Sequence, residues 1–269
     1  MGRLGNTAET NPQMVPDEVL GYGREVVASL QEALGDGLYG VYFVGSIALG
    51  GYVPGQSDID IVAVSAHAIP DELKGSLADA VSETTKSCPA RGLEFTLYRR
   101  EIAQSPPIAA DFEFNVNGGP RMARDIHLDS RREPRFWYVI DRAVAHRRGL
   151  AVYGPPPADV FADVSRSELL DGMIDSMRWH RQHERATLHS VLNATRAWRF
   201  AVEDALGSKL VGAPWACERW PNTQVIDAAV DLRYGRPATL GSAEVDALLD
   251  HVESVLVLAN ESGGTLSCP

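Results

Sequence analysis

Cysteine and long apolar runs are both scarce in this sequence, and each scarcity excludes a class of protein. The 269 residues include three cysteines, Cys88, Cys217 and Cys268, with no C-x-x-C spacing, so we expect neither a disulfide framework nor a zinc site. No run approaches the roughly 18 apolar residues that a membrane-spanning helix needs, and no signal-peptide pattern opens the chain. We therefore expect a cytoplasmic protein without a membrane partner.

Positive charge is also in short supply, since 25 Lys and Arg stand against 36 Asp and Glu and the formal net charge is -11. Such a chain lacks the basic stripe that follows a phosphate backbone, so we expect no nucleic-acid partner. An acidic surface attracts cations, including polyamines and amino sugars. Charge that only keeps the protein in solution would explain the composition equally well.

The pattern of apolar residues changes near the prolines of Val152–Phe161, where we place a domain boundary. Residues 1–14 are polar without a period and predict a flexible tail. The remaining residues predict an α+β fold, with a mixed sheet and flanking helices at 15–155 and an all-α helical bundle at 156–269. The elements that we expect are helices near 17–34 (capped by Asp17), 70–86, 165–182, 186–205, 212–233 and 242–260, and strands near 39–44, 58–64 and 92–98.

Two aspartates open the second of these strands, in the stretch SDID, although the strand is otherwise apolar. Alternation along a strand places Asp58 and Asp60 on one face, with Ile59 and Ile61 on the face that enters the core. Neighbouring carboxylates repel each other unless a cation lies between them, and Mg²⁺ commonly takes a couple of carboxylates together with substrate phosphates. Asp residues also open ordinary turns, so the pair alone does not decide the matter.

The stretch VGSIALGG, which follows the first strand, adds a possible phosphate site. Gly45 allows a phosphate to approach the backbone, and the Ser46 hydroxyl and the N–H groups of a short helix can donate to it. The stretch lacks the G-x-x-x-x-G-K-[ST] pattern of a P-loop. A Gly-Ser turn followed by SDID on the next strand is nevertheless a far more specific signal than either motif alone.

A third carboxylate, Glu94, lies in the strand GLEFTLYRR. Alternation puts Glu94 on the face opposite Leu93, Phe95 and Leu97. A salt-bridged surface glutamate would fit this position. Placed beside the two aspartates in the sheet, Glu94 could also serve as a third metal ligand or as a general base for a substrate hydroxyl.

Together these motifs resemble the nucleotidyltransferase superfamily that includes DNA polymerase β, whose members transfer a nucleoside monophosphate from a nucleotide with two Mg²⁺ held by three carboxylates. The stretch LNATRAWRFAVEDALGSKLVGAPWACERWP (Leu192–Pro221) resembles the helical domain of the aminoglycoside (3'')(9) adenylyltransferases. With LEFTLY and VYGP, the resemblance covers roughly residues 35–260. It implies transfer of AMP from Mg-ATP to a hydroxyl of spectinomycin, streptomycin or both, by a monomeric antibiotic-resistance enzyme.

The resemblance also assigns roles, position by position. Asp58, Asp60 and Glu94 match the magnesium ligands, and Glu94 matches the catalytic base. The residues that resemble contacts of ATP are Ser46, Ser57, Arg196, Lys209 and Tyr234. Read without the resemblance, arginine and lysine on helices are usually solvated, and a tyrosine at a helix end usually packs on the core.

The residues that would contact the antibiotic depart from the family pattern. Asn117 stands near the place of an aromatic residue, and the entrance to the helical domain is about three residues shorter, with Trp179 and Glu184 as the nearest equivalents. Histidines 180, 183 and 189 in this stretch could form a metal site, but we expect them on the polar faces of helices.

Three other functions remain open at this stage. The first is a superfamily enzyme that modifies a protein side chain or an endogenous metabolite, and the second is a nucleotide sensor without catalytic activity. The third, a polymerase or tRNA-end enzyme, is disfavoured by the acidic composition. Loss of any of the three carboxylates would favour the sensor, and all three are present.

Overall fold

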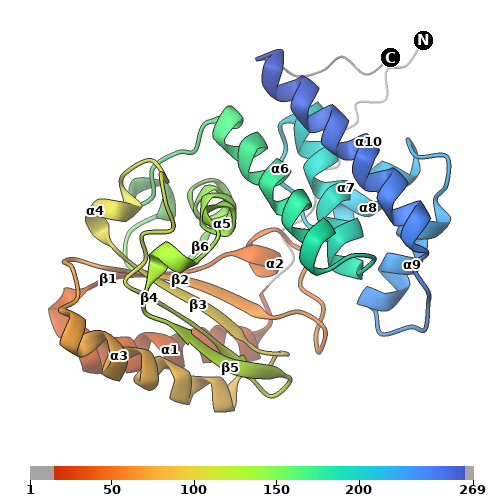
Figure 1. Cartoon of the computed structure of the whole chain (residues 1–269). Coiled ribbons are helices and arrows are strands. Elements are labelled where there is room, and N and C mark those ends of the chain that lie inside the picture. Colours follow the sequence, from red (N-terminus) through yellow and green to blue (C-terminus); the bar gives the residue numbers. More distant parts are fainter. Residues whose placement is uncertain (1–14, 264–269) are drawn as a thin grey trace, which may run out of the picture.

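The computed structural model describes residues 15–263, so the predicted tail at 1–14 and Cys268 lie outside the described residues. The described chain forms a sheet flanked by helices, followed by a bundle of helices that lies to one side of the sheet (Figure 1). This arrangement confirms the predicted α+β fold class. None of the helices within 15–263 is both long enough and apolar enough to cross a membrane.

The sheet contains six strands: β1 (Leu38–Phe43), β2 (Ile59–Ser65), β3 (Leu93–Arg99), β4 (Phe114–Gly119), β5 (Met122–His127) and β6 (Leu150–Tyr153). Their order across the sheet is β5-β4-β3-β2-β1-β6. The β2 and β3 strands run parallel, and every other neighbouring pair runs antiparallel. Asp60 and Glu94 are register partners on β2 and β3, so the topology sets their side chains next to each other.

The helices before the proline-rich stretch are α1 (Asp17–Leu34), α2 (Gly45–Ala48), α3 (Asp71–Thr84), α4 (Arg100–Ala103) and α5 (Arg135–Arg148). Those after it are α6 (Arg166–His183), α7 (Leu188–Glu203), α8 (Lys209–Cys217), α9 (Gln224–Arg233) and α10 (Ser242–Glu261). Figure 1 shows α1 and α3 on one face of the sheet and α5 over the other.

The two faces of the sheet follow from the alternation of residues along the strands. Ile59, Ile61 and Ala63 of β2 face α1 and α3, as do Leu93, Phe95 and Leu97 of β3, and all six side chains are buried there, as the sequence predicted. Val62 and Val64 lie on the opposite face with Tyr98, where they pack with residues of α5 such as Tyr138. Asp60 and Glu94 therefore point to the α5 side of the sheet, ahead of this apolar cluster.

Helix α5 joins the sheet to the bundle. Tyr138 and Val144 pack with the sheet residues, whereas Val139 and Ala143 belong to the core of the bundle. Two helices of the bundle begin where side chains satisfy their first N–H groups, since capping boxes open α6 at Ser165 and α7 at Thr187. Because α5 takes part in both cores, it fixes the bundle against the sheet.

Several elements differ from the sequence prediction. The single helix expected at 212–233 is wrong: α8 and α9 are separate, because Pro221 between them has no N–H to continue a helix. Asp17 does not cap α1; it is the first residue of the helix, where its negative charge still favours the positive helix end. Helix α5 and the strands β4, β5 and β6 were not predicted.

We predict that Arg142→Leu destabilises the protein by about 2–4 kcal/mol, because the buried Arg142 guanidinium donates to the carbonyls of Ile102, Ala103 and Ser105, which would lose their donor. The matched control is Arg148→Leu, since Arg148 is exposed on the same helix. Urea unfolding of both variants measures the difference. Equal midpoints would show that Arg142 does not anchor α5.

Candidate active site

A cavity of about 740 Å³ lies between the sheet and the bundle, and residues of both parts line it. Clefts of this size accommodate a nucleotide or a drug-sized molecule. The sequence-predicted site residues that line this cavity are Ser46, Ser57, Asp58, Asp60, Glu94, Asn117, Trp179, Glu184, Arg196 and Lys209. Tyr234, also predicted, does not line it and has 42% of its surface exposed.

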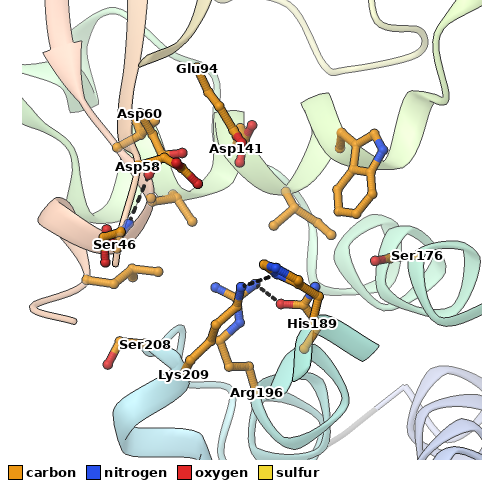
Figure 2. Close-up of a pocket in the computed structure, with 18 of the residues that line it drawn as sticks. Ser46, Asp58, Asp60, Glu94, Asp141, Ser176, His189, Arg196, Ser208 and Lys209 are labelled. Atoms are coloured by element: carbon orange, nitrogen blue, oxygen red, sulfur yellow. Dashed lines mark hydrogen bonds between the residues drawn. The ribbon is translucent and has the colours of Figure 1, made fainter. Parts of the chain in front are cut away.

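Carboxylates form one wall of the cavity. Asp58 precedes β2, Asp60 and Glu94 lie on β2 and β3, and Asp141 reaches the same region from α5. Figure 2 shows the four side chains gathered at one end of the cavity, across from Lys209 and Arg196. The wall is built by the parallel pairing of two strands whose second residues, Asp60 and Glu94, are acidic.

The carboxylates of this wall hold their protons more tightly than usual. Desolvation in the deep cavity and the charge of Asp58 raise the pKa of Asp60 to about 6. Desolvation and the negative charge of Asp60 raise the pKa of Glu94 well above its usual range, although Glu94 itself is open to the water of the cavity. Asp60 and Glu94 share a hydrogen bond, which requires a proton on one of them. A cation placed among these groups would relieve the repulsion.

The short helix α2 fixes the aspartate of β2. The Ser46 N–H donates to Asp60 Oδ2 at 3.2 Å. Gly45 has a φ of +53°, and a Cβ there would overlap the Asp60 carboxylate, so this position requires glycine. The Ser46 hydroxyl is buried without a hydrogen-bond partner in the described part of the chain, and it lines the cavity. It is therefore free to bind a ligand.

Basic side chains of the bundle form the opposite wall. Arg196 of α7 donates to Asn193 Oδ1 at 2.8 Å, and Lys209 of α8 donates to His189 Nδ1 at 3.2 Å. Burial and the positive charges of Arg196 and Arg233 lower the pKa of Lys209 to about 7. Because these cations repel one another and have lost water, the wall is suited to a ligand of high negative charge.

Arg233, rather than its neighbour Tyr234, connects α9 to the cavity. The Arg233 guanidinium donates to the Gly51 carbonyl and to Ser57 Oγ, both at 3.0 Å. Ser57 Oγ also accepts from the Val53 N–H at 3.0 Å, so its hydroxyl already has two partners. Arg233 thus ties the bundle to the loop that leads into Asp58.

The residues predicted to contact an antibiotic line the cavity from β4 (Asn117), from α6 (Trp179) and from the residue that follows α6 (Glu184). Asn117 donates to Asn115 Oδ1 at 3.0 Å. The Trp179 ring packs edge-on against Trp137 at 5.5 Å. Glu184 Oε2 lies 3.0 Å from His180 Nδ1. Of these three pairs, only the one between Glu184 and His180 contains a carboxylate.

The histidines differ from the expectation that all three occupy polar faces. His180 is buried with 3% of its surface exposed, and desolvation lowers its pKa to about 4. Asn193 Nδ2 lies 2.8 Å from His180 Nε2, so a chain of hydrogen bonds runs from Glu184 through His180 and Asn193 to Arg196. His183 instead stacks on Trp179 with ring centroids 4.8 Å apart.

The acidic wall fits a magnesium ion that the family resemblance implies. Asp58 Oδ1 is buried without a hydrogen-bond partner among residues 15–263, although Arg91 Nε lies 3.6 Å away. The same residues contain no group of three or more His, Cys, Asp or Glu arranged to hold an ion by themselves. Since Mg²⁺ usually takes one or two carboxylates and completes its shell with phosphate oxygens and water, Asp58 and Asp60 match what it needs from a protein.

Two cavity residues, Asp141 and Arg233, were missed from the sequence. Asp141 lies on the face of α5 that also carries Trp137, Tyr138 and Val144, all of which line the cavity. An acid within an apolar helical stripe is a readable signal, but α5 itself was not predicted. Arg233 carries no such signal, because arginine in the last turn of a helix is common.

Comparisons with known proteins agree with this site. The family model described as aminoglycoside adenylyltransferase, C-terminal domain, matches residues 159–256. The aminoglycoside (3'')(9) adenylyltransferase of Rhizobium radiobacter is 27% identical over 210 residues, which cover 73% of this chain and 76% of that protein. The enzyme of the same name from Escherichia coli is 27% identical over 210 residues, 73% of this chain and 77% of that protein.

The fold agrees as well. A spectinomycin adenyltransferase from Enterococcus faecialis, whose crystal structure was determined with ATP and spectinomycin, has a TM-score of 0.65 to this chain at 16% identity. The match covers 87% of this chain and 99% of that one. The family model, the curated relatives and the structural neighbour are all adenylyltransferases of aminoglycosides or spectinomycin, the class that the sequence motifs resemble. The chain is thus similar in sequence to aminoglycoside (3'')(9) adenylyltransferases over 73% of its length, and it shares the fold of a spectinomycin adenyltransferase.

Proposed function

We propose that this protein transfers AMP from Mg-ATP to a hydroxyl group of spectinomycin, of streptomycin or of both, and thereby confers antibiotic resistance. The observation that carries the proposal is the opposition of two charged walls across one cavity. Asp58, Asp60 and Glu94 stand on one side, and Arg196 and Lys209 stand on the other. A metal–triphosphate complex matches both walls, because its positive ion would meet the carboxylates and its negative phosphates would meet Arg196 and Lys209.

The residues divide the work of binding. Asp58 and Asp60 would hold Mg²⁺, which when bound neutralises phosphate charge and orients the triphosphate. Arg196 and Lys209 are placed to bind phosphate oxygens and to stabilise the negative charge that develops on the leaving pyrophosphate. The Ser46 hydroxyl, which has no partner in the described chain, can donate to a phosphate oxygen. Arg233 holds the loop before Asp58 in place.

Glu94 is the group best placed to remove a proton from the acceptor. In this step the acceptor hydroxyl loses its proton to the Glu94 carboxylate, and its oxygen bonds to the α-phosphorus of ATP. The bond between the α-phosphorus and the bridging oxygen breaks, and pyrophosphate leaves with the electron pair. Pyrophosphate is held by Arg196 and Lys209 on the far side of the cavity from the acceptor.

The test is direct. The purified protein is mixed with ATP, Mg²⁺ and a panel of aminoglycosides, and both pyrophosphate release and the mass of the drug are measured. The proposal requires a gain in mass equal to one AMP on spectinomycin or streptomycin. Pyrophosphate release without a modified drug, or no reaction across the panel, would contradict it and favour a protein or metabolite acceptor.

Glu94→Gln is predicted to reduce kcat by about 10²–10⁴ while the affinity for Mg-ATP stays within about twofold, because a general base acts in the transition state. Glu101→Gln serves as the control, since Glu101 is an exposed glutamate that does not line the cavity. Steady-state kinetics and calorimetry measure the two quantities. Near-normal turnover of Glu94→Gln would remove Glu94 from the mechanism.

Lys209 gives a prediction about protons. Because its pKa is about 7 in the free cavity, most Lys209 is neutral at pH 8, and the negative triphosphate should raise its pKa so that binding takes up a proton there. At pH 6 the lysine is already charged and the uptake should vanish. The groups facing Lys209 are His189, Arg196 and Glu94, and they also contribute to the number of protons taken up on ATP binding. The informative quantity is therefore the difference in proton uptake between the wild type and a Lys209 variant.

Calorimetry of ATP binding in buffers of different ionisation enthalpy measures this uptake. Lys209→Met should lose the uptake at pH 8 and bind ATP at least about tenfold more weakly. Lys86→Met, a change at an exposed lysine on the other side of the sheet, is the control. The same uptake in the wild type and in Lys209→Met would exclude this lysine from the phosphate site.

We also predict that spectinomycin is modified at least as efficiently as streptomycin. Asn117 is uncharged, and Glu184 already pairs with His180, so the guanidinium groups of streptomycin find few free acids at this end of the cavity. A buried cation without a carboxylate partner loses on the order of 10³ in affinity. Steady-state kinetics with both drugs decides the point, and a streptomycin kcat/KM about tenfold or more above that of spectinomycin would refute it.

A further inference from the structure

One carboxylate that lines the cavity differs from all the others in having no partner. Asp58 lies 3.6 Å from Arg91, Asp60 accepts from the Ser46 N–H, and Glu94 shares a hydrogen bond with Asp60. Asp125 and Glu133 pair with the two nitrogens of His127, and Glu184 pairs with His180. Among the carboxylates that line the cavity, Asp141 alone has neither a hydrogen bond nor an ion pair to residues 15–263.

The surroundings of Asp141 make an unpaired charge there costly. Desolvation in the deep cavity and the negative charge of Asp60 raise the pKa of Asp141 to about 7, although the positive charge of Arg196 acts in the opposite direction. A carboxylate in such a place gains most from a ligand that brings its own positive charge and donates a hydrogen bond.

Asp141 also differs in position from the expected metal ligands. Asp58 and Asp60 belong to the start of β2, and Asp60 is in register with Glu94 on β3. Asp141 approaches from α5, the helix that packs against α6 of the bundle. Figure 2 shows Asp141 beside Glu94, with Asp58 and Asp60 between it and Ser46. Asp141 therefore reaches the cavity beside the proposed base, from a helix and not from the strands that carry the expected metal ligands.

The adjoining wall holds a second polar group without a partner. Ser176 of α6 has 5% of its surface exposed and lines the cavity, and its hydroxyl makes no hydrogen bond to residues 15–263. Serines within helices commonly donate to a carbonyl of the preceding turn, as Ser254 does to the Asp250 carbonyl. Ser176 does not. Around it the cavity is lined by Trp137, Met173 and Met177, which are apolar.

We propose that Asp141 and Ser176 belong to the acceptor subsite, in which the Asp141 carboxylate binds an ammonium group of the drug and the Ser176 hydroxyl binds one of its oxygens. This inference rests on the proposed function and adds the group that recognises the positive charge of the acceptor. The apolar side chains of α5 and α6 contact the carbon skeleton of a compact ring. The ligand class is an aminocyclitol with at least one protonated amine.

The experiment measures binding of spectinomycin by calorimetry to the protein loaded with Mg²⁺ and an ATP analogue whose α,β-bridge cannot be cleaved. Three forms are compared: wild type, Asp141→Asn and the control Asp175→Asn, whose aspartate is exposed on α6 and does not line the cavity. Asp141→Asn should weaken spectinomycin binding by about 10- to 100-fold, the usual effect of losing a charge-assisted hydrogen bond. Its affinity for the nucleotide should change by less than about twofold.

A chemical arm separates recognition of charge from a general loss of the site. Spectinomycin acylated on both of its amino groups carries no ammonium and should bind wild type and Asp141→Asn equally, whereas Asp175→Asn should resemble wild type with both ligands. The thermal midpoint of Asp141→Asn should equal or exceed that of the wild type, since the substitution removes a charge from a repulsive cluster. A lower thermal midpoint of Asp141→Asn, together with similar losses of affinity for the nucleotide and for both forms of spectinomycin, would show that Asp141 has a structural role.

The remaining outcomes are also decisive. Loss of nucleotide affinity as large as the loss of spectinomycin affinity would make Asp141 a metal ligand, and unchanged spectinomycin binding would leave it without a role in recognition. Both overturn the inference. If spectinomycin binds as predicted and is not modified with ATP, the proposed function fails while the ammonium site stands. If the wild type binds no aminocyclitol, both fail.

Discussion

Electrostatic repulsion among carboxylates that the sheet forces together is the constraint on which the rest of the site depends. Parallel pairing of β2 with β3 places Asp60 beside Glu94, and the raised pKa values of both groups show that the cavity is unfavourable for their charges without a counter-ion. Such an arrangement does not stabilise the free protein. It persists because the surrounding core is large and fixes both strands. A positively charged ligand that relieves the repulsion between the carboxylates therefore binds more favourably.

The bundle supplies the complementary charge, and its attachment explains why the two walls face each other. Helix α5 packs into the apolar cluster over the sheet and into the core of the bundle, while Arg233 reaches back to the loop before Asp58. The chain of hydrogen bonds from Glu184 through His180 and Asn193 to Arg196 holds one cationic side chain at a fixed place. A triphosphate would then meet groups that need little rearrangement.

Much of this could be predicted where a residue type and its spacing have one physical meaning. Alternation placed Asp60 and Glu94 opposite the apolar residues of their strands, and the sequence pattern indicated most helices of the bundle. Asp141 and Arg233 could not be found in this way, because their roles arise from contacts between segments far apart in the chain. Tyr234 illustrates the same limit: the predicted residue is exposed, and the neighbouring arginine, one position earlier on the helix, makes the contacts.

The central claim is that the acidic wall binds the metal of a metal–nucleotide complex whose phosphates bind the basic wall. Calorimetry of ATP binding with and without Mg²⁺, in the wild type and in Asp60→Asn, tests it most directly. The account predicts that Mg²⁺ increases the ATP affinity of the wild type and that this increase disappears in Asp60→Asn, while the variant remains folded and binds metal-free ATP no more weakly. An equal effect of Mg²⁺ in both proteins would contradict the account.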